Sequence, residues 1–430
     1  MSQATMVAKV HPISSARLIA ACTIGNGLEF YDFIVFSYFA TVIGKEFFPT
    51  HTPATQLLLA LALYGTGFFM RPIGGIVLGG FADARGRKKA TILTLMMMAA
   101  GTFIVGIAPN YATAGTLGSL VLVFGRLLQG FSAGGEVGAS TTLLSEAATP
   151  ANRGFFGSWQ LASQGLAGLV VAMAAIIVNK SMSPEAVQSW GWRIPFILGV
   201  LIVPIGLWLR SALEETHANI DDPRARNIIV WREVFRAHWR QLIKGVCLVI
   251  GGTAATNVIL LYMPTYAVTT LHISSQGGLM AGLAAGLATL VASPIGGYLS
   301  DRFGRKTIIV SVAIIMLALL YPSFAYLNAH PSIANLVMIV GGLAIFNAFA
   351  GAAGIVMLTE LFPSTVRATG MALVYALGVT VFGGFGPFIV AWLIHATGSP
   401  IAPAYYVMAC MVVTMIALYF VPETKGTILS

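Results

Sequence analysis

Charged residues are scarce in this sequence. Only 9% of its 430 residues are Asp, Glu, Lys or Arg, whereas 57% are hydrophobic. A soluble domain carries about a quarter charged residues. The shortage therefore excludes a soluble globular enzyme, a disordered chain and a nucleic-acid-binding protein, and it indicates a membrane protein.

Residue patterns that hold metals or cofactors are also missing. The cysteines Cys22, Cys247 and Cys410 lie in apolar stretches, without a CxxC spacing or a histidine nearby, so we predict neither disulfides nor a metal site. Of the histidines, only His395 lies close to an apolar run, near its end. With no Ser/His/Asp arrangement and no P-loop motif in the sequence, we predict no enzyme, no cofactor and no ATP-driven pump.

Long apolar runs, by contrast, are abundant. A membrane-spanning helix needs about 20 apolar residues, and the sequence holds twelve such runs. They lie near residues 18–43, 56–82, 90–108, 114–142, 155–178, 192–209, 241–270, 276–300, 307–327, 334–358, 368–394 and 402–421. We therefore predict an all-α polytopic membrane protein. Glycine-rich stretches in these runs, such as Gly278–Gly286 and Gly351–Gly354, are typical of faces at which helices pack closely in lipid.

The positive charges predict the orientation of the chain. With the N-terminus inside, nineteen of the 24 Lys and Arg residues fall on the cytoplasmic side and two within spans. The far side receives only Lys45, Lys180 and Arg193. Because cytoplasmic loops of membrane proteins are enriched in Lys and Arg, we expect both termini to be cytoplasmic, in a bacterial inner membrane.

Two markers repeat in the second half of the chain. The pattern GxxxDxxGRK occurs at Gly79–Lys88 and again at Gly297–Lys306, 218 positions later. A Glu followed seven residues later by an Arg also occurs twice, 214 positions apart. Such self-similarity indicates a duplicated architecture, with a six-helix bundle in residues 1–209, a cytoplasmic linker in 210–240 and a second bundle in 241–430. Parallel repeats of this kind occur in transporters.

The repeated loops bring acidic and basic residues together on the cytoplasmic face. We predict a charge network there that holds the outward-open state and breaks when the inward-facing state forms. The predicted members are Asp83, Arg87, Glu146, Arg153, Asp301, Arg305, Glu360 and Arg367. The alternative is that these charges only set the topology. Carboxylates contribute little to topology, so the network is the preferred interpretation.

Several sequence strings resemble the metabolite:proton symporters of the major facilitator superfamily. They are the two GxxxDxxGRK loops, residues 25–33 (GNGLEFYDF), 71–75 (RPIGG), 125–136 (GRLLQGFSAGGE) and 190–196 (WGWRIPF). The resemblance spans about residues 20 to 420 and implies the major facilitator fold, alternating access and no cofactor apart from protons as the coupling ion. Residues 145–160 (SEAATPANRGFFGSWQ) look most like the citrate and tricarballylate branch.

Ionisable residues inside predicted spans are candidates for function because charges are costly in lipid. Glu29 and Asp32 are three residues apart, so they share a helix face and are not expected to ionise together. We predict that one of them carries the proton, with Asp32 preferred. The alternative is that one only forms a salt bridge with an arginine. Glu136, in the fourth span, is a further candidate for proton coupling.

Two arginines are the candidate anion anchors. A guanidinium stays charged and binds a carboxylate in a bidentate fork, which favours Arg71 as the main anchor, assisted by Arg126. The alternative for Arg71 is a pair with an acid that locks the fold. The resemblance also implies that Arg126 takes part in proton transfer. Polar residues predicted to complete the binding site are Asn26, Tyr31, Gln129, Gln160, Gln164, Tyr262, Asn347 and Tyr375.

The sequence thus predicts proton-coupled uptake of a small organic acid, such as citrate, tricarballylate or a related dicarboxylate. The alternatives are a proline, betaine or sugar carrier on the same fold, or proton-driven efflux. A zwitterionic substrate would need both a cationic and an anionic subsite. The expected partners are the substrate and membrane lipid, with no nucleic acid, and the sequence gives no sign of oligomerisation, so we expect a functional monomer.

Overall fold

The computed structural model describes residues 15–50, 52–85, 87–134, 141, 144–211, 234–363 and 366–427. Within the helices, it leaves out the side chains of residues 15–18, 21, 79–80, 82–88, 91, 202–203, 205–211 and 368. Below, the N-terminal half means residues 15–211, and the C-terminal half means residues 234–427.

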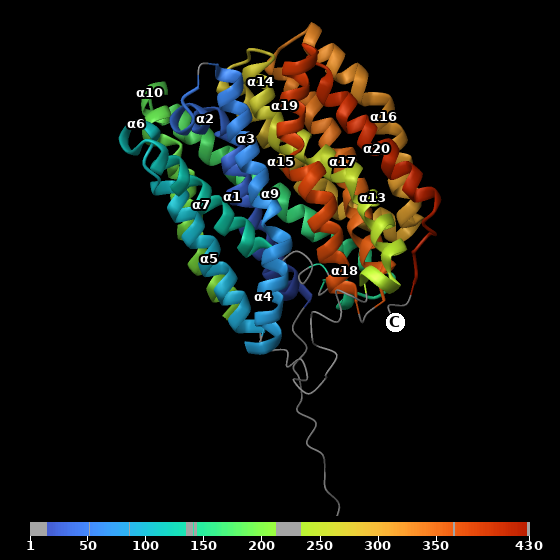
Figure 1. The fold of residues 1–430 in the computed structure, drawn as a ribbon. Helices are drawn as coiled ribbons and strands as arrows, with labels where there is room; N and C mark the ends of the chain where they lie inside the picture. The colour runs from blue at the N-terminus through green and yellow to red at the C-terminus, as the bar shows by residue number, and fades with distance from the viewer. Residues whose placement is uncertain are drawn as a thin grey trace, which may run out of the picture.

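The described part of the N-terminal half consists of helices joined by short loops (Figure 1). Its helices are α1 (Ser15–Tyr38), α2 (Ala40–Phe47), α3 (Pro53–Phe69), α4 (Arg71–Arg85), α5 (Arg87–Ile107), α6 (Tyr111–Ala114), α7 (Thr116–Ala133), α9 (Arg153–Ser181), α10 (Pro184–Ala186), the π-helix η1 (Val187–Gly191) and α11 (Arg193–Ser211). Side chains at the helix starts define several ends. The Thr52 hydroxyl, for example, accepts a hydrogen bond from the Thr55 amide at 3.3 Å at the start of α3, as expected of an N-cap.

The C-terminal half is built in the same way. Its helices are α13 (Trp239–Thr256), the π-helix η3 (Asn257–Tyr262), α14 (Met263–Thr269), α15 (Ser275–Phe303), α16 (Arg305–Ala329), α17 (Ile333–Leu361), α18 (Arg367–Val374), the π-helix η4 (Tyr375–Gly384), α19 (Gly386–Thr397) and α20 (Ala402–Tyr419). Figure 1 shows the two halves as neighbouring bundles whose long helices run in roughly the same direction.

The described helices confirm a multi-pass membrane protein. Nine of them are long and apolar enough to cross a membrane, and the bent pair α1–α2 makes a tenth candidate. Every one of the twelve predicted ranges contains a helix. The ranges 90–108 and 192–209 do not pass the same test on the described residues. In the first, the side chain of Thr91 lies outside the description, so the apolar helix that can be counted, Ile92–Ile107, is too short. In the second, many side chains of α11 lie outside the description.

Prolines account for breaks that the apolar pattern did not predict. Pro264 follows the π-helix η3, and Pro387 follows the π-helix η4. Proline has no N–H and clashes with the carbonyl four residues earlier, so the preceding turn widens. The Leu260 carbonyl, which loses its helical partner at Pro264, instead accepts a hydrogen bond from the Tyr38 hydroxyl of the other half at 3.1 Å. The broken helix thereby becomes a contact between the halves.

Glycines bring α9 of one half against α15 of the other. A Cβ atom at Gly165 or at Gly286 would run into the facing backbone, so only glycine allows this approach. The prediction that Gly278–Gly286 is a packing face is therefore confirmed. The prediction fails for Gly354, because a Cβ atom there would meet nothing within 4 Å. Gly354 lines a cavity instead.

Candidate functional site

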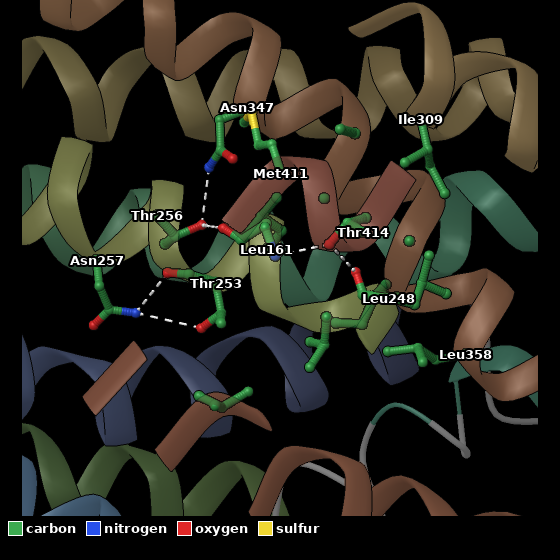
Figure 2. A pocket seen from close by; sticks show the side chains of 18 of the residues that line it. Leu161, Leu248, Thr253, Thr256, Asn257, Ile309, Asn347, Leu358, Met411 and Thr414 are labelled. Carbon is green, nitrogen blue, oxygen red and sulfur yellow. Dashed lines mark hydrogen bonds between the residues drawn. The ribbon is translucent and has the colours of Figure 1, made fainter. Parts of the chain in front are cut away.

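A cavity of about 110 Å³ lies between the two halves. Phe30 of α1, Phe68 of α3 and Leu161 and Gln164 of α9 line it from the N-terminal half, whereas α13, η3, α16, α17, η4 and α20 supply the rest. Figure 2 shows the polar groups of Thr256, Asn257 and Asn347 on one side of the view and apolar side chains such as Ile309 and Leu358 on the other. No charged residue is found among the described residues of its lining.

Three of the predicted substrate contacts line this cavity. Gln164 belongs to α9, Asn347 to α17 and Tyr375 to the start of η4. Asn347 donates a hydrogen bond from Nδ2 to the Thr256 hydroxyl at 2.9 Å. Thr256 was not predicted as part of the site, because a threonine within an apolar run carries no distinguishing sequence signal.

Four other predicted substrate contacts are engaged inside the protein, three of them in hydrogen bonds between helices. Asn26 of α1 donates to the Gln160 carbonyl at 3.0 Å, and Gln160 Nε2 donates to Asn26 Oδ1 at 2.7 Å. The Tyr31 hydroxyl donates to the Pro195 carbonyl at 2.8 Å. Tyr262 is buried in η3, its ring 6.3 Å from that of Tyr266. None of these four predicted residues lines the cavity in this conformation.

The Arg71 guanidinium forms an ion pair with Glu29. Nη2 of Arg71 lies 3.0 Å from Oε1 of Glu29, and both side chains are buried. Three aromatic rings surround the same guanidinium, with Phe68 at 4.2 Å, Phe33 at 4.7 Å and Phe30 at 5.7 Å from its central carbon. Such cation–π contacts stabilise a cation that has left water. The salt bridge between an arginine and Glu29 or Asp32, which the sequence left open as an alternative, is therefore present for Glu29.

Arg71 lies directly behind the wall of the cavity. Phe30 and Phe68, which contact its guanidinium, also line the cavity. Tyr375, a third lining residue, lies within electrostatic reach of Arg71 and Glu29. The Phe30 and Phe68 rings therefore lie between the guanidinium and the cavity.

Asp32 belongs to a separate polar cluster. Its carboxylate accepts hydrogen bonds from the Thr102 hydroxyl and, at 3.4 Å, from Gln129 Nε2. Gln129 Nε2 also donates to Thr102 at 3.0 Å. Glu29 and Asp32, predicted to act as a pair on one helix face, therefore have different partners. Thr102 was not predicted as part of the site because, like Thr256, it is a threonine within an apolar run and carries no distinguishing sequence signal.

Arg126 completes the cluster around Asp32. Its Nη1 donates to Gln129 Oε1 at 2.8 Å, and its Nη2 donates to the Tyr64 carbonyl at 3.4 Å. The fully buried guanidinium lies within electrostatic reach of Asp32. Its central carbon is also 4.7 Å from the centre of the Phe33 ring, the same distance as that of Arg71. One aromatic ring thus contacts both buried arginines.

Three predicted residues lie outside the described part of the site. Glu136 belongs to the undescribed segment 135–140, and the side chains of Asp83 and Arg87 are likewise outside the description. Their roles stay predictions.

Six predicted network residues meet at one end of the molecule, here called the charged end (Glu146, Arg153, Asp301, Arg305, Glu360 and Arg367). Arg153 of the N-terminal half pairs with Glu360 of the C-terminal half at 2.8 Å. In return, Arg367 of the C-terminal half pairs with Glu146 of the N-terminal half at 3.0 Å. The two repeated Glu/Arg markers therefore exchange partners between the halves.

The remaining contacts at the charged end involve Asp301 and Arg305. Arg305 lies 2.7 Å from Asp301 and 3.6 Å from Glu360. Asp301 also accepts hydrogen bonds from the Gly154 and Phe155 amides, at 2.7 and 2.9 Å. A carboxylate is stabilised by the free amides and dipole of a helix N-terminus. Asp301 of one half therefore caps α9 of the other.

Comparisons of the sequence add three further findings. The family model described as sugar (and other) transporter matches residues 18–218 and again 210–430. A citrate-proton symporter of Klebsiella pneumoniae is 39% identical over 402 residues, which cover 93% of this chain and 90% of that protein. The glycine betaine/proline/ectoine/pipecolic acid transporter OusA of Dickeya dadantii is 34% identical over 426 residues, 95% of this chain and 84% of that protein.

A comparison of the fold gives a similar result. The structure of the major facilitator proton:xylose symporter XylE bound to 6-bromo-6-deoxy-D-glucose matches with a TM-score of 0.75. The match covers 96% of this chain and 97% of the other, at 20% sequence identity. At that identity, the likeness concerns the fold alone.

Proposed function

Because the chain belongs to the sugar (and other) transporter family of the major facilitator superfamily, we propose that it takes up a small organic acid together with protons. The most suitable substrate is a tricarboxylate such as citrate or tricarballylate, or a related dicarboxylate. The cavity between the halves is the proposed binding site. The citrate-proton symporter of Klebsiella pneumoniae supports this substrate class by its 39% identity.

The observation that carries the proposal is the Glu29–Arg71 ion pair behind the cavity wall. Arg71 already binds one carboxylate there, so a carboxylate of the substrate can take its place. Glu29 and the carboxylate of the substrate then compete for the same guanidinium, so the exchange releases Glu29 from its partner. Symport also requires that proton binding and anion binding favour each other, and the proton is assigned to the next carboxylate along α1.

Asp32 is the second group in this coupling scheme. It shares a helix with Glu29 and lies close to Arg126 through Gln129. We assign the transported proton to Asp32 in preference to Glu29, and Glu136 remains a further candidate. Protons are the coupling ion, and no cofactor or metal is assigned.

The charged end is the proposed inner gate. We place it on the cytoplasmic side, with both termini, because most Lys and Arg residues fall on that side.

The molecule then has twelve spans in two six-helix halves, residues 1–209 and 241–430, joined by a cytoplasmic linker at 210–240. During alternating access, the Arg153–Glu360 and Arg367–Glu146 ion pairs between the halves break when the inward-facing state forms. The protein acts as a monomer in the bacterial inner membrane.

A second candidate substrate is a zwitterionic osmolyte such as proline or betaine. The uncharged lining of the cavity suits a molecule with no net charge, and OusA is 34% identical to this chain. The sugar (and other) transporter model and the fold of the xylose symporter support the family and the fold, but they do not favour a sugar over an organic acid as the substrate of this chain.

Reconstituted liposomes test the proposal. With an inward proton gradient imposed, we expect labelled citrate to accumulate and the accumulation to collapse when a protonophore is added. Unlabelled tricarballylate, 2-oxoglutarate, proline and betaine serve as competitors, and liposomes without protein serve as the control. Transport of betaine or proline in place of citrate would assign the chain to the osmolyte carriers.

Replacing Thr102 tests the cluster around Asp32. Thr102→Val removes the hydroxyl that donates to Asp32, and a hydrogen bond to a charged group contributes about 1.5–3 kcal/mol. We expect gradient-driven uptake to fall about tenfold, measured as the initial rate in liposomes. Thr102→Ser keeps the hydroxyl and should transport like the wild type. Equal loss in both variants would show that Thr102 acts through packing.

Replacing Glu360 tests the charged end. Glu360→Gln leaves the buried guanidinium of Arg153 without its anion and leaves Arg305 with Asp301 alone, and breaking a buried pair costs about 3–5 kcal/mol. We expect this end to open more often. A cysteine at Ser145, which is fully buried and contacts Thr359 of the other half, should then react at least tenfold faster with a maleimide in detergent.

The matched control for Glu360 is Glu146→Gln. The Glu146 side chain is 49% exposed, and its buried partner Arg367 also donates to the Thr359 and Phe362 carbonyls at 3.0 and 3.3 Å, so losing this pair should cost less than losing the Arg153–Glu360 pair. The rate of labelling should therefore change little. Both variants are made after the three native cysteines have been replaced. An unchanged labelling rate in Glu360→Gln would mean that other contacts keep this end closed.

A further inference from the structure

Asn347 carries a hydrogen-bond acceptor that the described part of the protein leaves unused. The residue lines the cavity and is only 6% exposed. Its Nδ2 donates to Thr256, whereas its Oδ1 has no hydrogen-bond partner among the described residues. A buried acceptor without a partner is unfavourable. An occupant of the cavity that donates a hydrogen bond to this oxygen is therefore favoured over one that does not.

The hydrogen bonds of Thr256 fix the orientation of the Asn347 amide (Figure 2). The Thr256 hydroxyl donates to the Gly252 carbonyl at 3.0 Å, and a hydroxyl has only one proton to donate. Towards Asn347, Thr256 is therefore an acceptor. The amide nitrogen must face it, which leaves the amide oxygen without a partner.

The neighbouring Asn257 shows the contrast. Its Nδ2 donates to the Thr253 carbonyl at 2.9 Å, and its Oδ1 accepts a hydrogen bond from the Tyr64 hydroxyl at 3.3 Å. Both ends of that amide are used within the protein. Asn257 is therefore fully hydrogen-bonded within the protein, whereas only the amide nitrogen of Asn347 has a partner.

There is room for a ligand beside Asn347. Gly354 lies two turns further along α17, and Gly252 lies one turn before Thr256 on α13. Both line the cavity, and a Cβ atom at either would meet nothing within 4 Å. The cavity is thus open on the faces of both helices that carry the Asn347–Thr256 hydrogen bond.

We infer that Asn347 is a specificity-determining residue that accepts a hydrogen bond from a hydroxyl of the substrate. The inference rests on the proposed transport of an organic acid. The carboxylates of such an acid are directed towards Arg71, behind Phe30 and Phe68, and its hydroxyl faces the uncharged side of the cavity. The protein therefore selects a hydroxy-tricarboxylate, such as citrate, over tricarballylate, the same skeleton without the hydroxyl.

The test compares the two acids in one protein. Wild-type protein in liposomes should take up citrate at least tenfold more efficiently than tricarballylate, judged by competition against labelled citrate and by direct uptake of each acid. Asn347→Leu keeps the size of the side chain but removes the acceptor, so the preference should fall to about one. Because tricarballylate uptake is measured in the same preparation, a folding defect lowers both rates and leaves the ratio intact.

Two glycine variants on α17 form a matched pair for the location of the site. Gly354→Ala adds a methyl group to the cavity wall, whereas Gly342→Ala adds the same group on the same helix away from the cavity, in space that is also free. We expect Gly354→Ala to slow uptake of both acids and Gly342→Ala to slow neither. Equal effects of the two variants would overturn this placement of the site.

The outcomes separate this inference from the proposed function. If the wild type transports neither acid, the proposed function fails. If it transports both acids but Asn347→Leu leaves their ratio unchanged, organic-acid uptake stands and the role of Asn347 is wrong. If Asn347→Leu slows both acids equally while its melting temperature in detergent is unchanged, the donor is a protonated carboxyl group, and the hydroxyl assignment is wrong.

Discussion

Arg71→Gln should abolish citrate uptake. The guanidinium is buried, and its position behind Phe30 and Phe68 makes it the cation that a carboxylate in the cavity can reach after the smallest movement. Hydrogen bonds to charged groups contribute about 1.5–3 kcal/mol each, so the loss of a bidentate contact should lower uptake about a hundredfold or more. The measurement is the initial rate of labelled citrate uptake in liposomes.

Two variants serve as controls, one for the planar geometry of the Arg71 guanidinium and one for the loss of an arginine elsewhere in the protein. Arg71→Lys keeps a positive charge but loses the planar fork, so partial uptake is expected. Arg193→Gln removes a guanidinium that contacts backbone carbonyls at 2.7 and 2.9 Å far from the cavity, and it should transport nearly normally. Normal uptake by Arg71→Gln would exclude Arg71 as the anion anchor.

The competing interpretation is that Arg71 only locks the fold by pairing with Glu29. Arg71→Gln alone leaves Glu29 without this partner, which can destabilise the protein for reasons unrelated to substrate. The double variant Glu29→Gln/Arg71→Gln removes both charges together. If it recovers the melting temperature but transports no citrate, Arg71 binds substrate. If it recovers uptake as well, the pair is structural.

Much of the architecture could be predicted from the sequence. Apolar runs of sufficient length predicted helices in all twelve ranges, and the motifs predicted the transporter family, which the comparisons confirm. The positions of the π-helices could not be predicted in this way. They depend on how the chain accommodates Pro264 and Pro387, and the apolar pattern continues unchanged across both.

Less of the candidate site could be predicted. The sequence places Glu29 and Asp32 on one face, but only the neighbouring helices decide that Glu29 pairs with Arg71 while Asp32 binds Thr102. The exchange of partners between the Glu/Arg markers likewise depends on how the halves dock. Asn26 and Gln160 were predicted as ligand contacts because they are polar residues within spans. In this structure they bind each other, and contact with a substrate stays a prediction.

Phe33 shows how the two charged clusters are connected. Its ring lies against both the Arg71 and the Arg126 guanidinium, 4.7 Å from the central carbon of each. Phe33 is therefore a packing contact that the two arginines share. The substrate anchor and the proposed proton carrier are separate in hydrogen bonding but adjacent in packing, so substrate and proton binding can influence each other without sharing a residue.

Asp32→Asn should uncouple transport from the proton gradient. Asparagine has the shape of a protonated aspartate but cannot release a proton, so the variant holds the proton-loaded form throughout the cycle. A carrier that moves one proton per substrate concentrates its substrate up to about tenfold for each pH unit across the membrane. We expect Asp32→Asn to lose this accumulation, while exchange of labelled for unlabelled citrate stays within about threefold of the wild type.

Glu29→Gln distinguishes the two carboxylates. If Asp32 carries the proton, Glu29→Gln frees Arg71 from a competing anion, so citrate should bind more tightly and still accumulate with the gradient. If Glu29 carries the proton, the pattern reverses: Glu29→Gln exchanges without accumulating, and Asp32→Asn still concentrates citrate. The ratio of internal to external citrate at steady state, with and without a protonophore, decides between them. Both carboxylates lie on α1, one turn apart, but Glu29 pairs with Arg71, whereas Asp32 binds Thr102 and Gln129. The two substitutions therefore test each carboxylate together with its own partners.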